Sequence, residues 1–124
     1  GYVTALNKAQ RLLIGYLFLR EEFPWVQHWD SFPSTGKFAR GLEFSTQPFD
    51  VSRREVISSP SLFGAPMYRW LAAKSSIQAR FLVFYTQVPD GMMRVDGVKL
   101  EGRQLTIEDR ASGKKIVLRA SLGL

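Results

Sequence analysis

The chain has 124 residues with no cysteine and one histidine, and 17 Lys and Arg against 11 Asp and Glu give a net charge of +6. The absence of cysteine excludes disulfides, thiolate metal sites and a cysteine nucleophile, and a single His cannot build a multi-histidine metal site. Hydrophobic residues make up 45% of the sequence and aromatic residues 13%, which is typical of an ordered domain. We expect neither a metal nor a cofactor.

Short runs of apolar or alternating residues, separated by Pro and Gly, predict an all-β chain. Residues 53–59 fit either one turn of helix or a loop. Regularly spaced short strands suggest a sandwich or a barrel, and of these we expect an antiparallel β-sandwich over residues 1–124 as a single domain, with residues 95–120 as a C-terminal β-hairpin extension. In chain order, the predicted strands cover residues 2–6, 12–20, 25–30, 38–45, 67–72, 77–88, 95–100, 104–110 and 115–120.

Two of these strands, residues 12–20 and 77–88, carry apolar side chains on both faces. A strand that buries one face and solvates the other alternates apolar and polar residues, so these two strands need cover on both sides. Either long aromatic side chains fill the core, or an N-terminal region, a second copy or another chain covers the extra surface. We therefore expect self-association, or packing of the chain, as a C-terminal fragment, against the missing N-terminal region of a larger β-sandwich protein.

The longest apolar run, residues 12–19, is too short to span a bilayer as a helix. We therefore expect a soluble protein of the cytoplasm or periplasm with no membrane partner. The positive net charge would suit a polyanion partner, but the basic residues are scattered and no nucleic-acid-binding motif accompanies them. Nucleic acid is consequently the less favoured partner.

The segment over residues 38–49 carries the main candidate for chemistry. Alternation along a strand places Glu43 on one face with the small residues Gly41 and Ser45, while Arg40 lies on the opposite face. Small neighbours leave room beside the Glu43 carboxylate, which suits a general base held on a rigid strand. A solvated Glu on an edge strand fits the same pattern.

Residues 25–30 offer a second candidate. Alternation places Trp25, Gln27 and Trp29 on one face, where two indole rings beside an amide would form a platform for a sugar ring. A pair of core tryptophans explains the pattern equally well. The neighbouring His28 fits a structural or surface imidazole.

Arg40 also has two interpretations. If its guanidinium group is buried, it needs an anionic or carbonyl partner. That partner is either a hydroxyl or acidic group on a ligand, or an internal carboxylate such as Asp30 or Glu55. The internal pairing is the simpler explanation.

The order of these segments resembles the C-terminal part of galactose-mutarotase-like (aldose 1-epimerase-like) proteins. The run GLEFSTQPF at residues 41–49 resembles a family motif of an apolar residue, Glu, a Thr/Gln-containing stretch and Pro. Residues 23–29 resemble the strand before that motif, and residues 68–88 resemble the turn and strand after it. The resemblance implies a β-supersandwich fold and an aldose or glycan as ligand, with Glu43 as catalytic base. With the alternation argument, it makes the candidate substrate-binding residues Trp25, Gln27, Trp29, Arg40 and Gln47.

In the resembled family, mutarotation needs a base that takes a proton from the C1 hydroxyl and an acid that protonates the ring oxygen. The family acid is an upstream His in a chain more than twice this length, and the family's Pro-Gly-Glu turn is Ala73-Lys74-Ser75 here. We therefore expect a carbohydrate-active isomerase at full length that is inactive as this fragment. The alternative is a non-catalytic sugar-binding or assembly domain of the same fold.

Overall fold

The computed structural model describes all residues from Gly1 to Leu124. The chain is mostly β-strand in antiparallel sheets, which confirms the predicted all-β class. Its contacts group it into two compact units: the first unit comprises Gly1–Leu19 and Arg80–Leu124, and the second unit comprises Arg20–Ala79. The elements are β1 (Tyr2–Asn7), β2 (Leu12–Phe18), β3 (Trp25–Ser31), β4 (Ala39–Ser45), α1 (Arg53–Ser58), β5 (Ser61–Leu62), β6 (Ala65–Pro66), β7 (Phe81–Gln87), β8 (Gly97–Glu101), β9 (Gln104–Asp109) and β10 (Lys114–Arg119).

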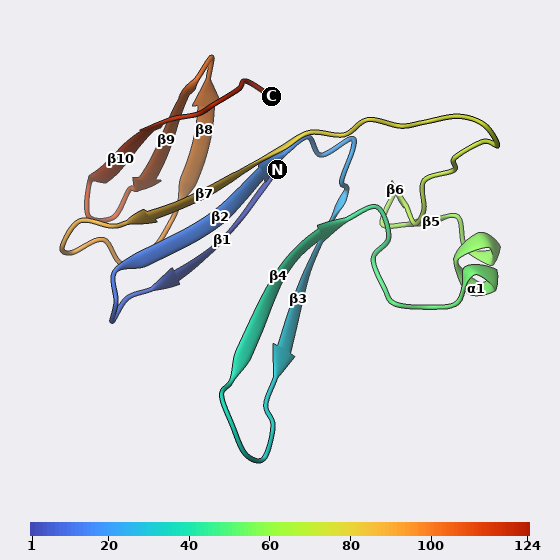
Figure 1. Ribbon diagram of the computed structural model, residues 1–124, viewed down its shortest axis with the longest axis horizontal. Coiled ribbons are helices and arrows are strands. Elements are labelled where there is room, and N and C mark those ends of the chain that lie inside the picture. Colours follow the sequence, from blue (N-terminus) through green and yellow to red (C-terminus); the bar gives the residue numbers. More distant parts are fainter. The chain divides into compact units, whose positions relative to one another are not determined.

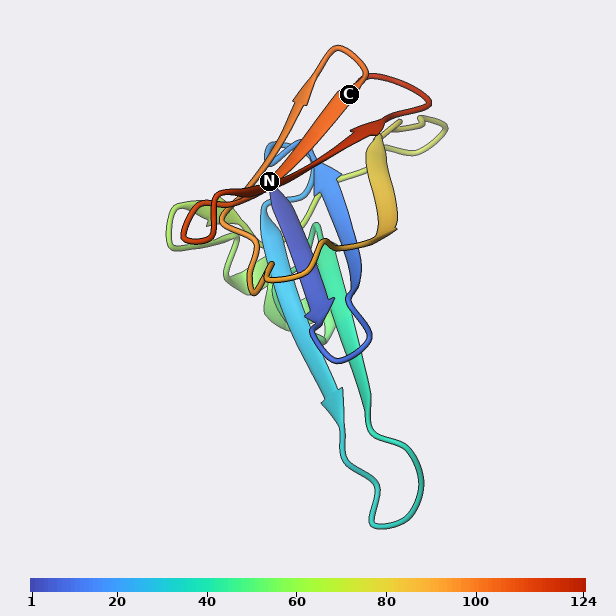
Figure 2. The ribbon, with the colours of Figure 1, turned by 90° about the vertical axis from the view of Figure 1, so that its left-hand side faces the viewer.

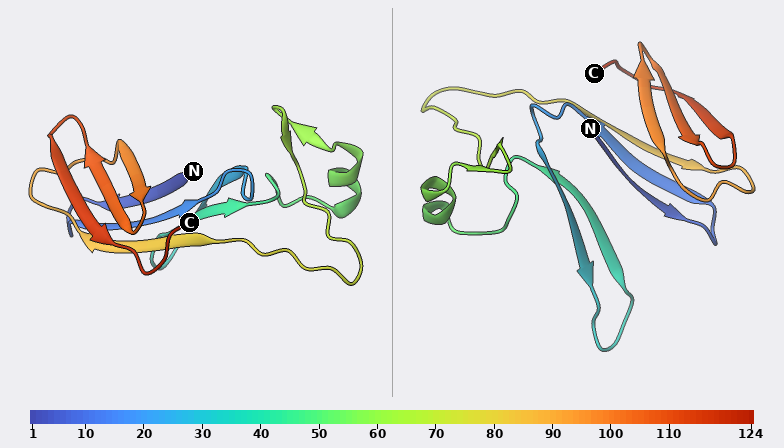
Figure 3. Two further views of the ribbon diagram at one scale, coloured as in Figure 1. Left: turned by 90° about the horizontal axis from the view of Figure 1, so that it is seen from above. Right: turned by 180° about the vertical axis from the view of Figure 1, so that it is seen from behind.

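The first unit contains two three-stranded antiparallel sheets (Figure 1). In one sheet β2 lies between β1 and β7, so strands that are far apart in the sequence are neighbours in this sheet. In the other sheet β8, β9 and β10 follow one another as a meander (Figure 3). Residues 95–120, predicted as a hairpin extension, contain the three strands of this meander.

The hydrophobic core of the first unit joins residues from both of its sheets. Period-two alternation explains the contribution of β9, because Leu105 and Ile107 point inward while Gln104 and Thr106 do not. Residues 95–120 therefore supply part of the core. The buried members of the cluster are Leu13, Phe84, Val88, Met92, Leu105 and Ile107.

The sequence predicted that β2 and β7 are apolar on both faces and need cover on both sides. In β7 only one of the two faces is buried. Leu82 and Phe84 face the core, whereas Phe81, Val83 and Tyr85 on the opposite face are 49%, 53% and 66% exposed. Long side chains therefore do not fill the core from both sides of this strand. β7 also forms an edge of its sheet.

Asp109 is the buried charged residue of the core, with 1% of its surface exposed. Its Oδ2 accepts a hydrogen bond from the Met93 amide at 2.9 Å, and its Oδ1 accepts from the amides of Ala111 at 3.1 Å and Ser112 at 3.2 Å. These backbone hydrogen bonds, led by that of Met93, lower the pKa of Asp109 to about 2. The carboxylate thus joins the β9–β10 turn to the segment before β8.

The second unit contains the β3–β4 hairpin, helix α1 and the two-residue strands β5 and β6. The hairpin is long, and its loop projects at the tip (Figure 2). Helix α1 begins at the Ser52 cap, where Ser52 and Glu55 form a capping box that satisfies the free amides of the first turn. Of the two interpretations of residues 53–59, the helix is therefore the one observed. With six residues in this helix, the structure holds no helical segment of the length and apolarity that crossing a membrane requires.

The strand predicted for residues 67–72 is wrong. The Met67 amide donates to the Pro60 carbonyl at 3.0 Å, but the chain after it has no neighbouring strand with which to form a ladder. Lys74 adopts a positive φ of 58° and the Ser75 amide returns to the Ala72 carbonyl, which marks a turn. The strand predicted from residue 77 consequently begins at Phe81.

Candidate functional site

The register of the β3–β4 hairpin brings the two sequence candidates onto one face. Gln27 lies opposite Glu43 and Trp29 lies opposite Gly41. Directly opposed residues of an antiparallel pair project to the same side of the sheet. The candidate base and the candidate sugar platform therefore belong to one surface.

A depression of about 550 Å³ lies against this surface, within the size range of small-molecule sites. We refer to it as the hairpin depression. Its walls come from β3, β4 and the segment that follows β4, and they include no Lys or Arg side chain. The lining residues are Gln27, His28, Trp29, Glu43, Ser45, Gln47, Pro48, Phe49 and Asp50.

The Glu43 carboxylate is exposed and has no hydrogen-bond or ion-pair partner within the chain. Gly41 has no side chain, which lets the Glu43 carboxylate and the Trp29 ring approach each other. A Cβ atom added at Gly41 would lie 3.4 Å from Glu43 Oε1 and 3.6 Å from Trp29 Cε3. The carboxylate and the indole ring therefore flank the same small space.

The side chains of Gln27 and Ser45 fix the backbone of residues 47–48, which forms one wall of the depression. The Gln27 Nε2 donates to the carbonyl oxygens of Gln47, at 3.2 Å, and of Pro48. The Ser45 hydroxyl lies 2.5 Å from the same Gln47 carbonyl and 3.3 Å from Gln27 Oε1. Gln47 in turn donates its side-chain amide to the Phe49 carbonyl. Both glutamines thus shape the depression through backbone contacts, and these contacts already engage their amide donors.

The two tryptophans on this face have different surroundings. The Trp25 indole N–H donates to the Pro66 carbonyl at 2.6 Å, which ties β3 to β6. Trp29 is 54% exposed. Trp29 is therefore the ring available to a ligand, and Trp25 fixes the base of the hairpin.

Arg40 lies on the opposite face and does not reach the depression. Its Nε and Nη2 donate to Asp30 Oδ1 and Oδ2 at 2.7 Å and 3.3 Å, and this hydrogen bonding lowers the pKa of Asp30 below its ordinary value. His28 Nε2 lies 3.4 Å from the same Asp30 carboxylate. The internal partner that the sequence left open is thus Asp30, while Glu55 caps helix α1.

Phe49 and Asp50 line the depression but were not predicted as site residues from the sequence. Phe49 is 51% exposed, and its position directly after Pro48 could have drawn attention to it. Beyond Asp50 the surface continues into a second depression of about 540 Å³, whose lining includes Arg53 and Trp70. The residues between β4 and α1 therefore separate two hollows of the second unit.

Comparison of the chain with protein-family models, with curated proteins and with solved structures finds no match in any of the three. Any assignment of function consequently depends on the chemistry of the site.

Proposed function

We propose that the hairpin depression binds a carbohydrate, with Trp29 as the platform for a sugar ring and Glu43 as the acceptor for its hydroxyl groups. The observation that carries the proposal is the depression of about 550 Å³ whose lining includes an exposed indole, that of Trp29, and a carboxylate without an internal partner, that of Glu43. An indole offers a flat apolar surface to the C–H face of a sugar, and a carboxylate accepts hydrogen bonds from its hydroxyls.

The charge of the lining supports a neutral ligand. Glu43 and Asp50 are the only Asp or Glu side chains in the depression, and no Lys or Arg accompanies them. A phosphate or a polyanion would meet repulsion here, although the whole chain carries a net charge of +6. The positive charge of the protein is therefore no argument for a polyanion at this site.

A second candidate function is catalysis of mutarotation, in keeping with the resemblance of residues 41–49 to the aldose 1-epimerase motif and with a galactose-mutarotase-like β-sandwich. The unpartnered Glu43 carboxylate favours it, since a base must reach the C1 hydroxyl without first breaking an internal contact. The His28 ring contacts Asp30, and the depression shows no other imidazole to act as the acid. Binding is therefore the activity proposed for this chain, and catalysis would require an acid from elsewhere.

Replacing Trp29 tests the binding proposal. We expect Trp29→Ala to weaken the binding of galactose or glucose oligosaccharides by about tenfold or more, because it removes the ring that the sugar covers. Isothermal titration calorimetry with a panel of neutral oligosaccharides measures the change. Trp70→Ala is the matched control, since Trp70 is 65% exposed but does not line the hairpin depression. Absence of glycan binding, or equal effects of the two substitutions, would refute the proposal.

Replacing Glu43 separates binding from catalysis. Glu43→Gln keeps the shape and one acceptor oxygen, so we expect only a several-fold loss of affinity from the weaker hydrogen bond. Polarimetry of freshly dissolved α-galactose then measures mutarotation. If the unmodified protein accelerates mutarotation and Glu43→Gln lowers that acceleration by about 10²-fold or more, Glu43 acts as a general base. Mutarotation at the buffer rate in both proteins leaves binding as the function.

A further inference from the structure

The positive charge of the protein is concentrated in the first unit. Gly1–Leu19 and Arg80–Leu124 hold ten Lys and Arg but only five Asp and Glu, a net charge of +5. The second unit holds seven against six, a net charge of +1. Since the first unit is assembled from two separate stretches of chain, this imbalance is not visible as a run of basic residues.

Every side-chain carboxylate of the first unit is already engaged. Four of them pair with a Lys or Arg, and Asp109 is buried among backbone amides. Internal pairing therefore leaves an excess of cations that no Asp or Glu in this unit neutralises. The pairs are Asp90 with Arg11 at 2.5 Å, Asp96 with Arg94 at 2.8 Å, Glu101 with Lys99 at 2.6 Å and Glu108 with Lys115 at 2.9 Å.

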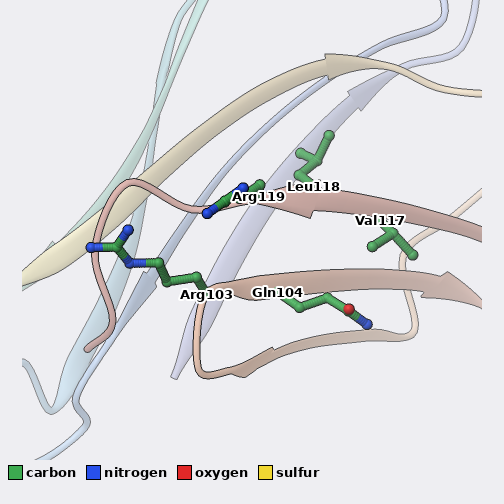
Figure 4. A pocket seen from close by; sticks show the side chains of 5 residues that line it. All are labelled: Arg103, Gln104, Val117, Leu118 and Arg119. Atoms are coloured by element: carbon green, nitrogen blue, oxygen red, sulfur yellow. The ribbon is translucent and has the colours of Figure 1, made fainter.

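Two of the excess cations, Arg103 and Arg119, line one hollow of about 380 Å³ at the end of the β9–β10 pair. We call this the arginine hollow. Figure 4 shows both arginine side chains extending beyond the same end of the β9 and β10 strands. Gln104, Val117 and Leu118 complete the lining, with the Val117 and Leu118 side chains on opposite sides of β10, so the hollow combines two guanidinium groups with an amide and an exposed apolar side chain, that of Val117.

The backbone places the two arginines at the same end of the β9–β10 pair. Arg103 follows Gly102, whose φ of +59° makes the tight turn between β8 and β9. The Ala120 amide donates to the Arg103 carbonyl at 2.7 Å, and Arg119 lies opposite Gln104 in the β9–β10 register. Neither guanidinium has an ion-pair or hydrogen-bond partner within the chain. Two like charges thus line one hollow without a counter-charge.

We propose that the arginine hollow binds an oxyanion, a phosphate or sulfate group, carried by a small ligand whose adjacent carbon atoms contact Val117. Guanidinium groups donate paired N–H bonds that match the oxygens of such a group, and an anion removes the repulsion between the two arginines. The volume of the hollow fits a small ligand. The arginine hollow lies in a different unit from the hairpin depression, so the proposal of oxyanion binding is independent of the proposal of carbohydrate binding.

Titration of the isotope-labelled protein with inorganic phosphate and with phenyl phosphate, at constant ionic strength and pH 7.5, tests the proposal. We expect saturable shifts of the backbone amide NMR signals of residues 102–104 and 117–120, with tighter binding of phenyl phosphate because its ring contacts Val117. Arg103→Gln with Arg119→Gln should weaken binding about tenfold or more, through loss of charge-assisted hydrogen bonds.

Lys8→Gln with Lys114→Gln is the matched control, since both lysines are exposed cations of the first unit without a carboxylate partner, and both lie outside the hollow. This pair removes the same charge and should leave phosphate affinity within about twofold, as diffuse attraction is largely screened by salt. All four side chains are exposed, and equal melting temperatures of the variants confirm that folding is intact. Equal losses in the two pairs, or the absence of saturable shifts in the unmodified protein, would overturn the proposal.

Discussion

Gly15 shows how one missing side chain shapes the core of the first unit. It lies directly opposite Phe84 in the β2–β7 register, and the Phe84 ring lies over the place where a side chain would be. A Cβ atom added at Gly15 would be within 2.9 Å of three atoms of that ring. Phe84 is 5% exposed and surrounded by core residues, so its ring has little room to move aside.

Gly15→Ala is therefore expected to lower the free energy of unfolding by about 1–3 kcal/mol, the usual cost of overpacking a core. Urea unfolding followed by circular dichroism measures the change. The same substitution in a Phe84→Leu background should cost less, because the smaller side chain leaves the Cβ its space. Equal losses in both backgrounds would show that the contact with Phe84 is not the cause.

Site residues that share a face of one strand could be predicted from the sequence, whereas contacts between distant residues could not. Alternation along single strands was enough to place Glu43 with Gly41, and Trp29 with Gln27. It could not show that Trp25 contacts Pro66, 41 residues away, or that Gln27 holds the Pro48 carbonyl. Long-range backbone contacts of this kind carry no local pattern, so the division of roles between the two tryptophans emerges only from the fold.

At the scale of elements, the longer paired strands were predictable, whereas the two-residue strands β5 and β6 were not. The strands β1 to β4 and β8 to β10 follow the predicted runs closely, and β7 is shorter than its predicted run. Residues 67–72 have a similar apolar content but no partner strand. Strand formation depends on pairing as much as on composition, which explains this error. The galactose-mutarotase-like arrangement and the sugar ligand stay predictions.

The connection between β9, β10 and the segment before β8 depends on the charge of Asp109. Its pKa of about 2 lies below the ordinary value of 3.8, so the folded state binds the proton more weakly than the unfolded state. The resulting stabilisation is fully present above about pH 4 and is lost as the pH falls toward 2. We expect thermal unfolding, followed between pH 2 and 7, to show this decline.

Asp109→Asn should lower the melting temperature at neutral pH, because its NH₂ group would face either the Met93 amide or the Ala111 and Ser112 amides. The variant should also lose part of the decline in acid. An unchanged acid profile in this variant would assign the decline to other carboxylates, such as Asp96, whose pKa is also lowered by its hydrogen bond with Arg94.

At the scale of the whole molecule, the two units differ in how much apolar surface they bury. The hydrophobic cluster belongs to the first unit, whereas the buried apolar side chains of the second are Val56, Met67 and Pro48. Regions with few buried contacts open at a lower free energy than the core. The second unit, which carries the hairpin depression, is therefore the less stable of the two.

Native-state hydrogen exchange should reveal this difference. We expect the amides of β2, β7 and β9 to exchange more slowly than those of β3 and β4 by about two orders of magnitude. Mass spectrometry of peptic fragments, or NMR, measures the rates. If a saturating glycan is present, the β3–β4 amides should slow while those of β9 change little. Uniform protection across both units would instead mean that they open together.

The exposed outer face of β7 has a practical consequence for handling the protein. Phe81, Val83 and Tyr85 form a row of apolar and aromatic side chains on a strand at the edge of its sheet. Such an edge strand presents an apolar surface and backbone hydrogen-bonding groups to which another chain can add. Substitutions on this outer face should therefore change solubility more than folding, and a lysine in place of Val83 is the substitution to use for work at high concentration.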